Sequence, residues 1–551
     1  MGRHTTTYRA WYAAVLGAYC LYAAIYIART SFVIDGTRYF TLLDDAMISM
    51  RYAENLIRGY GPVFNAGAAP VEGYTNPLWM LYMALVHLLP VGAAKISLVI
   101  QISGLFLGLA TLVAVKRLAE ALRPHHPLVP LAAVALTAFY LPLNTYNLQG
   151  MEVGLLAFGV TLAMWLAARA LQGGGALWPL FALLGGLTLV RIDAAIPAAV
   201  LTAGVFWALP ARRGEVVRWS ALCVGGLLAA QTALRYWYYG DLLPNTYYLK
   251  MTGYPARLRI AHGWEVLVGF LNRQYWLPFA APLLAVRWLR HRAYLLLLAV
   301  ILAQAAYSVY VGGDVWDWWG GANRFISIAM PLLFVALSLA LATVAARLRP
   351  ERKGNGGSLS RPARRLFVAA AAVCLVLLNM LRGPASLSEW ALTSRPLHWT
   401  DNANMVRRAN LVRELTSENA TIAVTWAGAI PYFSGRPTVD LLGKTDRRLA
   451  HGSAAERPPF RRWGEFLPGH MKWDYAYSIG VLQPDVIVQL WGSATAAAPW
   501  LRDQYDVVPL GPFVFSFRRE APTVHWQRLA ELSGRTFSDG RGSIPPSPSD
   551  L

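Results

Sequence analysis

Long apolar runs, each followed by a short polar segment, fill the first 382 residues of this chain. Several of them approach the roughly 20 residues that a helix needs to cross a bilayer. Soluble proteins carry roughly a quarter charged residues, whereas here 56% of the residues are hydrophobic and only 15% are charged. The pattern predicts a polytopic α-helical membrane protein with about 10–12 transmembrane helices. The runs lie near 11–30, 127–142, 153–171, 176–190, 194–209, 217–235, 275–288, 293–311, 326–346 and 365–382.

Basic residues set the expected orientation of these helices. The formal net charge of +20 would also suit a nucleic-acid-binding protein. However, the arginines and lysines cluster in short loops between apolar runs, as the positive-inside rule describes. We therefore expect a lipid bilayer as partner and no nucleic acid. The loops expected on the cytoplasmic side lie near 116–123, 212–213, 287–292 and 347–365.

Polar and aromatic residues gather in the loops expected on the opposite side. This arrangement requires an odd number of crossings between Asn76 and Lys116, and we expect one crossing plus a re-entrant or interfacial piece. A transporter would place polar residues near mid-membrane, at broken helices. Polarity at one face instead favours a reaction at the outer membrane surface. The outer loops are 31–76, 143–152, 191–193, 236–273 and 312–325.

The character of the chain changes after its last apolar run. We expect residues 1–382 to form the transmembrane domain and 383–540 to form a soluble α/β domain on the outer side. Residues 421–435 predict a strand, a Gly turn and a short helix, and 484–490 predict a buried strand. Residues 541–551 are rich in Pro and Ser and are expected to be a disordered tail.

The sequence contains no pattern for a nucleotide or a soluble cofactor. It has no P-loop, dinucleotide fingerprint, HExxH or serine nucleophile elbow. Cys20, Cys223 and Cys374 lie far apart inside apolar runs, so they predict neither a disulfide nor a zinc site. A divalent cation is left open, because carboxylates can hold one, but no metal ligands are assigned. A transferase without a nucleotide site needs a donor already outside the cytoplasm, which means a lipid-linked sugar.

Asp44 and Asp45 stand side by side in the first outer loop. They could form a solvated helix start, since acids are favoured at a helix N-terminus. Alternatively, one carboxylate could act as a base on an acceptor hydroxyl in a partly desolvated cleft. Neighbouring residues on a helix point about 100° apart, so one acid can face the cleft while the other binds a second group.

Other outer-loop residues also have two interpretations. The segment 72–77 could be an interfacial turn with belt aromatics, or its Glu, Tyr and Asn could bind a sugar. Arg235, Lys250 and Arg324 could be snorkelling anchors. They could also neutralise the charge that develops on a lipid-phosphate leaving group.

The first outer loop, with DDAMISMRYAENL, GPVFN and VEGYTNPLW, resembles the first extracytoplasmic loop of GT-C polyprenyl-phosphate-sugar glycosyltransferases. It is most similar to the branch with the mycobacterial terminal β-(1→2) arabinofuranosyltransferase and the pilin arabinosyltransferases. A Trp-rich stretch before Arg324 departs from the family. The likeness continues in order through LQGMEVGLLAF, RIDA, YYGDLLPNTYYLK, YVGGDVW, NRF, GAIPYFSGRPTVDLLGKTD, PGHMKWD and QPDVIV.

This resemblance implies a GT-C membrane fold with juxtamembrane helices and an extracytoplasmic α/β domain. The implied donor is decaprenyl-phosphate-linked D-arabinofuranose or a similar lipid sugar. The family's essential acid maps onto Asp44, with Asp45 beside it. We expect Asp44 to be the base or a stabilising carboxylate and Asp45 to orient it. We expect a monomer in the bacterial plasma membrane whose site faces the periplasm and acts in cell-wall arabinan biosynthesis.

The resulting hypothesis is transfer of one sugar to a hydroxyl of an extracytoplasmic glycan, with inversion or retention left open. A pilin-type protein O-glycosyltransferase and a lipid-sugar flippase or transporter remain as alternatives. Arg324, Lys250 and Arg235 are expected to hold the donor phosphate. The residues expected to bind sugar or acceptor are Glu72, Tyr74, Asn76, Asn245, Glu152, Asp314, His470 and Lys472, with Asp440 and Lys444 also presenting the acceptor.

Overall fold

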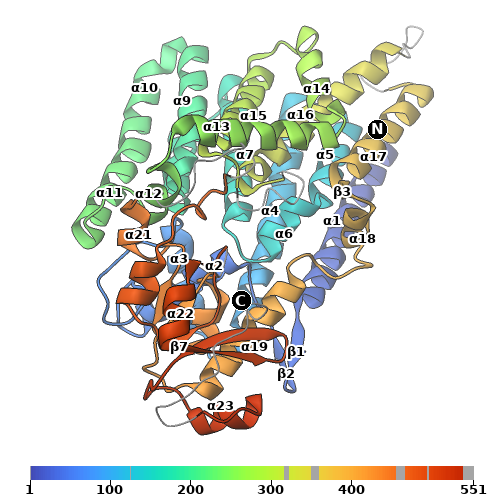
Figure 1. Cartoon of the computed structure of the whole chain (residues 1–551). Coiled ribbons are helices and arrows are strands. Elements are labelled where there is room, and N and C mark those ends of the chain that lie inside the picture. Colours follow the sequence, from blue (N-terminus) through green and yellow to red (C-terminus); the bar gives the residue numbers. More distant parts are fainter. Residues whose placement is uncertain are drawn as a thin grey trace.

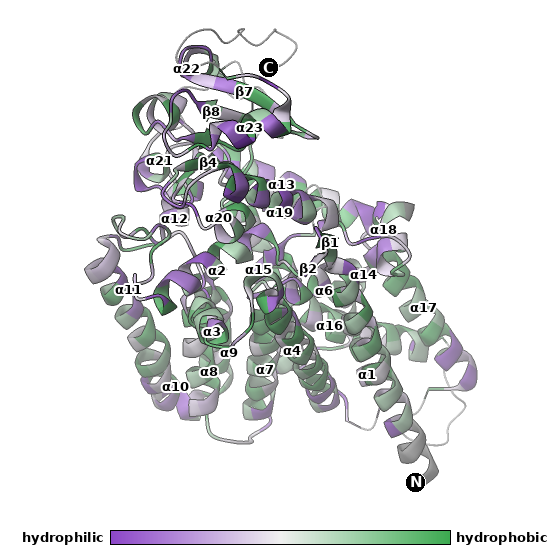
Figure 2. Ribbon diagram, turned by 90° about the horizontal axis from the view of Figure 1, so that it is seen from below, coloured by the Kyte–Doolittle hydropathy of each residue, from purple (hydrophilic) through white to green (hydrophobic). Residues whose placement is uncertain are grey.

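The computed structural model describes residues 2–537 apart from 125, 315–321, 349–358, 454–465 and 493–495. Helices dominate as far as Asn379, and a mixed sheet with short helices follows at one end of the helical bundle (Figure 1). Hydrophobic residues predominate in the bundle, and hydrophilic ones are frequent around the C-terminal elements (Figure 2). The predicted fold class, a helical membrane region followed by an α/β region, is confirmed. The predicted tail 541–551 lies outside the described residues.

In the described part of the chain, seven helical segments are long and apolar enough to cross a membrane. A further pair, α5 (Leu128–Ala138) and α6 (Leu141–Leu148), meets the same criteria together but is bent by 57°. The seven are α1 (Gly2–Thr30), α4 (Ala93–Leu122), α7 (Val153–Leu171), the stretch from α10 (Arg213–Trp219) to α11 (Gly226–Tyr239), α15 (Arg292–Val311), α16 (Arg324–Leu348) and α17 (Arg361–Asn379).

Shorter apolar helices pack among these segments. The region 77–115 contains one helix of spanning length, α4, and the shorter α3. The runs predicted at 176–190 and 194–209 form helices of 13 and 14 residues, too short for a straight crossing of roughly 30 Å. The number of crossings therefore stays a prediction. The shorter apolar helices are α3 (Pro77–His87), α8 (Trp178–Val190), α9 (Ala195–Ala208) and α14 (Leu277–Leu284).

Helix α16 lies at the centre of the bundle. The most apolar segment of this helix is 94% buried, because α5, α7, α14, α15 and α17 pack around it. A helix that is hydrophobic all round suits such a position. Since α16 begins at Arg324, the most enclosed helix of the bundle fixes this guanidinium in place.

Helix α4 packs closely on α6 through a glycine. A Cβ at Gly104 would lie 2.4 Å from the backbone oxygen of Asn147. The Asn147 side-chain amide in turn donates to the Gly104 carbonyl at 2.6 Å. Gly108, one turn later, faces the Tyr19 hydroxyl. Small residues four apart let membrane helices approach closely, so this pair sets the distance between α4 and its neighbours.

Short juxtamembrane elements lie between the bundle and the C-terminal region. The hairpin β1 (Phe32–Ile34) and β2 (Thr37–Tyr39) turns through Asp35 and Gly36, both with positive φ, as two-residue hairpin turns require. Helix α2 (Asp44–Ile57) packs on α3 and on α20 of the C-terminal region. Helices α12 (Asn245–Met251) and α13 (Ala256–Arg273) complete this layer.

The C-terminal sheet has the order β5-β4-β6-β8-β7, parallel from β5 to β6 and antiparallel beyond. Both strands predicted there, at 421–435 and 484–490, are confirmed as β4 and β6. The carboxyl ends of parallel strands meet at one edge of a sheet, so the loops after β4 and β5 emerge together. The strands are β4 (Ile422–Val424), β5 (Thr438–Asp440), β6 (Val486–Ile487), β7 (Tyr505–Leu510) and β8 (Phe513–Arg518).

Helices cover this sheet and connect it to the bundle. Strand β3 (Leu381–Gly383) and α18 (Pro384–Trp390) follow α17 directly, and α19 packs on α20. The remaining helices are α19 (Trp399–Leu415), α20 (Ala429–Ser434), α21 (Arg447–His451), α22 (Ala498–Gln504) and α23 (Trp526–Ser533).

The contact between α4 and α6 predicts the effect of one methyl group. Gly104→Ala should lower the free energy of unfolding by about 1–3 kcal/mol, because the obstructing atom is backbone and cannot rotate away. Thermal unfolding of the purified protein in detergent measures this as a lower Tm. Gly186→Ala in α8 is the matched control, since a Cβ there meets nothing within 4 Å. Equal Tm values for the two variants would contradict the close packing.

Candidate active site

A polar cavity lies where the juxtamembrane helices, the ends of the bundle helices and the C-terminal region meet. Its walls come from α2, the segment before α3, the start of α7, η1 (Ile192–Ala194), α12, the end of α15 and the start of α16. Two residues of the C-terminal region, Lys444 and Pro468, close it. Its polar lining includes Asp45, Tyr74, Asn76, Glu152, Arg191, Asp193, Lys250, Arg324 and Lys444.

Asp45 is the acid of α2 that faces this cavity. Its Oδ2 accepts a hydrogen bond from Nη2 of Arg324 at 2.7 Å, and its Oδ1 accepts one from Nζ of Lys444 at 3.0 Å. Burial alone would raise the pKa of Asp45, but the charges of Lys444, Arg324 and Lys250 outweigh it and hold the pKa well below its usual range. Asp45 is therefore ionised at neutral pH.

Asp44 points away from the cavity. Its two oxygens accept hydrogen bonds from the backbone amides of Ala429 at 2.8 Å and Gly428 at 3.2 Å. The residue is only 2% exposed, and burial raises the pKa of its carboxyl to about 6 against the charge of Lys444 and the two amides. The resemblance made Asp44 the essential acid, yet the structure uses its carboxylate to hold the loop between β4 and α20.

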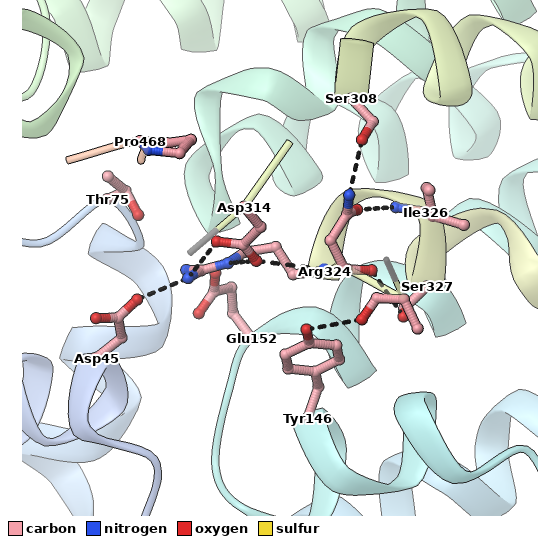
Figure 3. A network of polar contacts seen from close by, with 12 residues as sticks. Asp45, Thr75, Tyr146, Glu152, Ser308, Asp314, Arg324, Ile326, Ser327 and Pro468 are labelled. Atoms are coloured by element: carbon pink, nitrogen blue, oxygen red, sulfur yellow. Dashed lines mark hydrogen bonds and ion pairs between the residues drawn. The ribbon is translucent and has the colours of Figure 1, made fainter. Parts of the chain in front are cut away.

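Arg324 is fixed between two acids. Its Nε and Nη2 donate to the two oxygens of Asp314 at 2.7 and 3.0 Å, and Nη2 also reaches Asp45 (Figure 3). Such a forked contact orients the planar guanidinium. Asn323 secures the turn, because its side chain accepts from the Ile326 amide at 3.0 Å and donates to Ser308 at 2.9 Å. The predicted site residue Asp314 thus positions Arg324.

Lys250, at the end of α12, is the cation that lines the cavity without a counter-charge. Among the residues that the structure describes, its ammonium has no ion-pair or hydrogen-bond partner. Burial and the neighbouring Arg324 lower the pKa of Lys250 to about 8; Lys444 acts in the same direction, and Asp45 and Asp314 oppose it. An unpaired cation beside Arg324 makes this part of the cavity suited to an anion.

A second ionic group also lines the cavity. Arg191 donates to Glu152 at 2.9 Å, to Asp193 at 2.6 Å and to the Thr75 hydroxyl at 3.0 Å. Asn76 donates to the other oxygen of Glu152 at 2.8 Å. These charges are mutually satisfied, so Glu152 and Asn76, both predicted to bind sugar, shape the wall through Arg191. Arg191 and Asp193 were not among the predicted site residues, and the weak RIDA motif is the sequence signal that could have identified them.

Arg235 and Glu72 do not line the cavity. They form a buried ion pair with each other, and the Glu72 carbonyl accepts from the Asn245 amide at 3.1 Å. Burial raises the pKa of Glu72 to about 7 despite the charge of Arg235. The structure therefore does not bring Arg235 to the other predicted phosphate ligands. Tyr74 does line the cavity, and its hydroxyl bonds that of Tyr239 at 2.9 Å.

Asn245 also lies behind the cavity wall. Its Nδ2 donates to the backbone oxygens of Gly443 and Lys444, each at 3.0 Å. The Asp440 carboxylate accepts from the amides of Leu442 at 3.0 Å and Thr445 at 2.8 Å. Both predicted binding residues therefore hold the loop that carries Lys444.

His470 and Lys472, predicted to present the acceptor, are buried within the C-terminal region. The His470 ring packs against those of Trp426 and Trp491. Lys472 donates to the Tyr248 carbonyl at 3.0 Å, which fastens the C-terminal region to α12. Neither residue lines the cavity, although Pro468, close to both in sequence, does.

The charged groups of the cavity do not form a metal site. Within the described residues, no group of three or more His, Cys, Asp or Glu is arranged to hold an ion. Asp45, Asp314, Glu152 and Asp193 each already face an arginine or a lysine. The donor set of the described residues therefore does not fit the divalent cation that the sequence left open.

Solved structures of similar fold cover almost the whole chain. ArnT from Cupriavidus metallidurans in the apo state matches with a TM-score of 0.55 and 14% identity, over 97% of this chain and 100% of that one. ArnT bound to undecaprenyl phosphate matches with the same TM-score and identity over 92% and 97%. The oligosaccharyltransferase AglB from Archaeoglobus fulgidus, in complex with an inhibitory peptide and a dolichol-phosphate, has a TM-score of 0.53 and 11% identity over 93% and 74%.

Sequence comparisons cover smaller parts of the chain. A terminal β-(1→2)-arabinofuranosyltransferase from Corynebacterium glutamicum is 28% identical over 263 residues, which are 44% of this chain and 37% of that relative. A family described as a domain of unknown function (DUF8728) matches residues 397–537, which include Lys444. The helical bundle, its outer cavity and the similarity to ArnT and AglB together show that this chain has the fold of the GT-C glycosyltransferases.

Proposed function

We propose that this chain is a membrane glycosyltransferase that takes its sugar from a polyprenyl phosphate. The fold supports this proposal, because the similar structures include ArnT bound to undecaprenyl phosphate and AglB bound to a dolichol-phosphate. The Corynebacterium glutamicum relative, an arabinofuranosyltransferase, supports D-arabinofuranose as the sugar. A glycan of the cell envelope, such as arabinan, is the proposed acceptor.

The unpaired ammonium of Lys250 is the observation that carries this proposal. It lines a cavity next to Arg324, whose guanidinium is already oriented by Asp314. A phosphate entering here would give Lys250 its missing counter-charge and would accept hydrogen bonds from both cations. The same contacts would stabilise the negative charge that grows on the phosphate when the sugar leaves.

Asp45 is the proposed base. An acceptor oxygen forms a bond to the anomeric carbon while the bond from that carbon to the phosphate oxygen breaks. The acceptor proton passes to Asp45, and the electron pair leaves with the lipid phosphate, which Lys250 and Arg324 neutralise. The low pKa of free Asp45 depends on its cations. When phosphate draws the hydrogen bonds of Arg324 toward itself, the pKa of Asp45 rises, and the carboxylate becomes a better proton acceptor.

The proposed orientation places this site on the periplasmic side of the bacterial plasma membrane. Helix α10, which begins at Arg213, and the N-terminus lie at the end of the bundle away from the C-terminal sheet (Figure 2). Basic residues at that end suit the cytoplasmic side. The cavity then opens where a lipid-linked sugar is available without a nucleotide donor.

A protein acceptor is the second candidate. AglB, which shares the fold, was solved in complex with an inhibitory peptide, so this architecture accommodates a polypeptide beside the lipid. A flippase finds less support, because the ionic groups lie at one end of the bundle rather than along its middle. Mass analysis of products made from decaprenyl-phosphoryl-arabinose with a glycan primer or a pilin peptide separates the three functions.

Asp45→Asn should lower the rate of transfer by roughly two to four orders of magnitude, because the amide cannot accept the proton. The measurement is the initial rate of sugar transfer from decaprenyl-phosphoryl-arabinose in proteoliposomes. Binding of undecaprenyl phosphate should persist, since the variant removes a negative charge from a site for anions. Near-normal transfer by Asp45→Asn would refute Asp45 as the base.

The titration of Lys250 predicts a pH dependence of donor binding. Its pKa of about 8 means that the free site is positively charged below pH 8 and loses this charge above it. The affinity for decaprenyl-phosphoryl-arabinose, whose phosphodiester keeps its charge, should therefore be constant between about pH 7 and 8, above the pKa of Asp44, and fall above pH 8. Lys250→Arg should remove the fall, because arginine stays protonated. An unchanged decline in Lys250→Arg would show that another group titrates.

A further inference from the structure

Lys444 is the cation that the C-terminal region contributes to the cavity. It lies 399 residues after Asp45 in the sequence, yet its Nζ is 3.0 Å from the Asp45 carboxylate. The residue is 5% exposed, so its charge is directed at the cavity rather than at bulk solvent. A region that matches a domain of unknown function thus places a charged group among the proposed reacting groups.

The charges around Lys444 show what it adds. Without it, the three cations Arg191, Lys250 and Arg324 and the three acids Asp45, Glu152 and Asp193 would line the cavity, and the lining would be neutral. With it, four cations and three acids line the cavity, and the lining has an excess of one positive charge. A lining of net positive charge attracts an anion more strongly than a neutral one.

The loop that bears Lys444 is built to hold its position. It follows β5, and the Asp440 carboxylate accepts hydrogen bonds from the backbone amides of Leu442 and Thr445. Gly443 adopts a positive φ of 76°, which lets the chain turn sharply. Asn245 from α12 donates to the backbone oxygens of Gly443 and Lys444 in this turn.

Asp44 fixes the neighbouring loop of the same sheet edge. Its carboxylate accepts the amides of Gly428 and Ala429, and the approach is so close that a Cβ at Gly428 would lie 1.9 Å from the Asp44 backbone oxygen. The loops after β4 and β5 emerge at one edge, where the Leu441 amide donates to the Val424 carbonyl at 3.0 Å, so a shift of the first loop is transmitted to the second. The two adjacent acids of α2 thus make different contacts with the C-terminal region. Asp44 accepts hydrogen bonds from its backbone amides, and Asp45 forms an ion pair with Lys444.

We infer that the C-terminal region contributes directly to the active site. Its Lys444 binds the donor's phosphate together with Arg324 and Lys250, and Asp44 is a positioning residue for Lys444. This inference rests on the proposed function. It assigns to residues 397–537 the supply of a phosphate-binding cation. It also assigns Asp44 a role that requires no proton transfer.

The test measures the binding of undecaprenyl phosphate to the full-length protein in detergent, with sugar transfer measured in parallel. Lys444→Met should weaken binding roughly ten- to a hundred-fold, the loss expected for one hydrogen bond between charged groups. Lys444→Arg should restore most of the affinity, because the charge returns. Arg447→Met is the matched control: Arg447, three residues later, forms a half-exposed ion pair with Asp241 and should bind as the wild type does.

A double-mutant cycle tests the positioning role of Asp44. Asp44→Asn loses one of the two acceptors for backbone amides. As a single change it should weaken undecaprenyl phosphate binding, but combined with Lys444→Met it should cause little further loss of affinity. Gly428→Ala should behave in the same way. Thermal unfolding of each variant shows whether it is folded. If Lys444→Met is not folded, the affinity of Lys444→Arg for undecaprenyl phosphate decides the test.

The possible failures are distinct. If the wild type binds no undecaprenyl phosphate, the proposed function fails and this inference with it. If the wild type binds but folded Lys444→Met binds equally well, only the role of Lys444 is overturned. If Asp44→Asn keeps wild-type affinity but loses transfer, Asp44 acts in the chemical step, and its positioning role is overturned.

Discussion

The ionic contact of Asp45 with Arg324 and Lys444 is the interaction on which the site depends. It joins the first outer loop to residues 279 and 399 positions later, so it links α2, the central helix α16 and the C-terminal sheet. Each of these charges is nearly buried, and removing one partner would leave the others uncompensated, which is costly in a site shielded from water. The contact therefore also makes the relative placement of the three elements specific.

Much of the fold could be predicted because it follows from local patterns. Apolar runs indicated the bundle, and β-branched runs indicated β4 and β6. The grouping of Lys250 with Arg324 also followed from loops assigned to the same side. The number of crossings did not follow, because runs of spanning composition, such as those at 176–190 and 194–209, form helices interrupted by the polar turn at Arg191.

The details of the site depend on long-range contacts that no local pattern encodes. Two adjacent acids look alike in a sequence, and only the direction of α2 decides that Asp45 faces the cavity and Asp44 the backbone of Gly428. Arg235 looked equivalent to Lys250 until the structure paired it with Glu72. In each case the partner that decides the role lies more than 100 residues away.

The division of charges explains how such a site stays folded without its donor. Arg324 and Lys444 share the acids that are present, so their burial is compensated at all times. Lys250 alone has no counter-charge among the described residues, and it is a lysine, whose pKa burial can lower to about 8. An arginine there would stay charged at any working pH, whereas Lys250 can lose its proton above pH 8. At neutral pH Lys250 is charged, so the resting site holds a positive charge that a phosphate anion neutralises when it arrives.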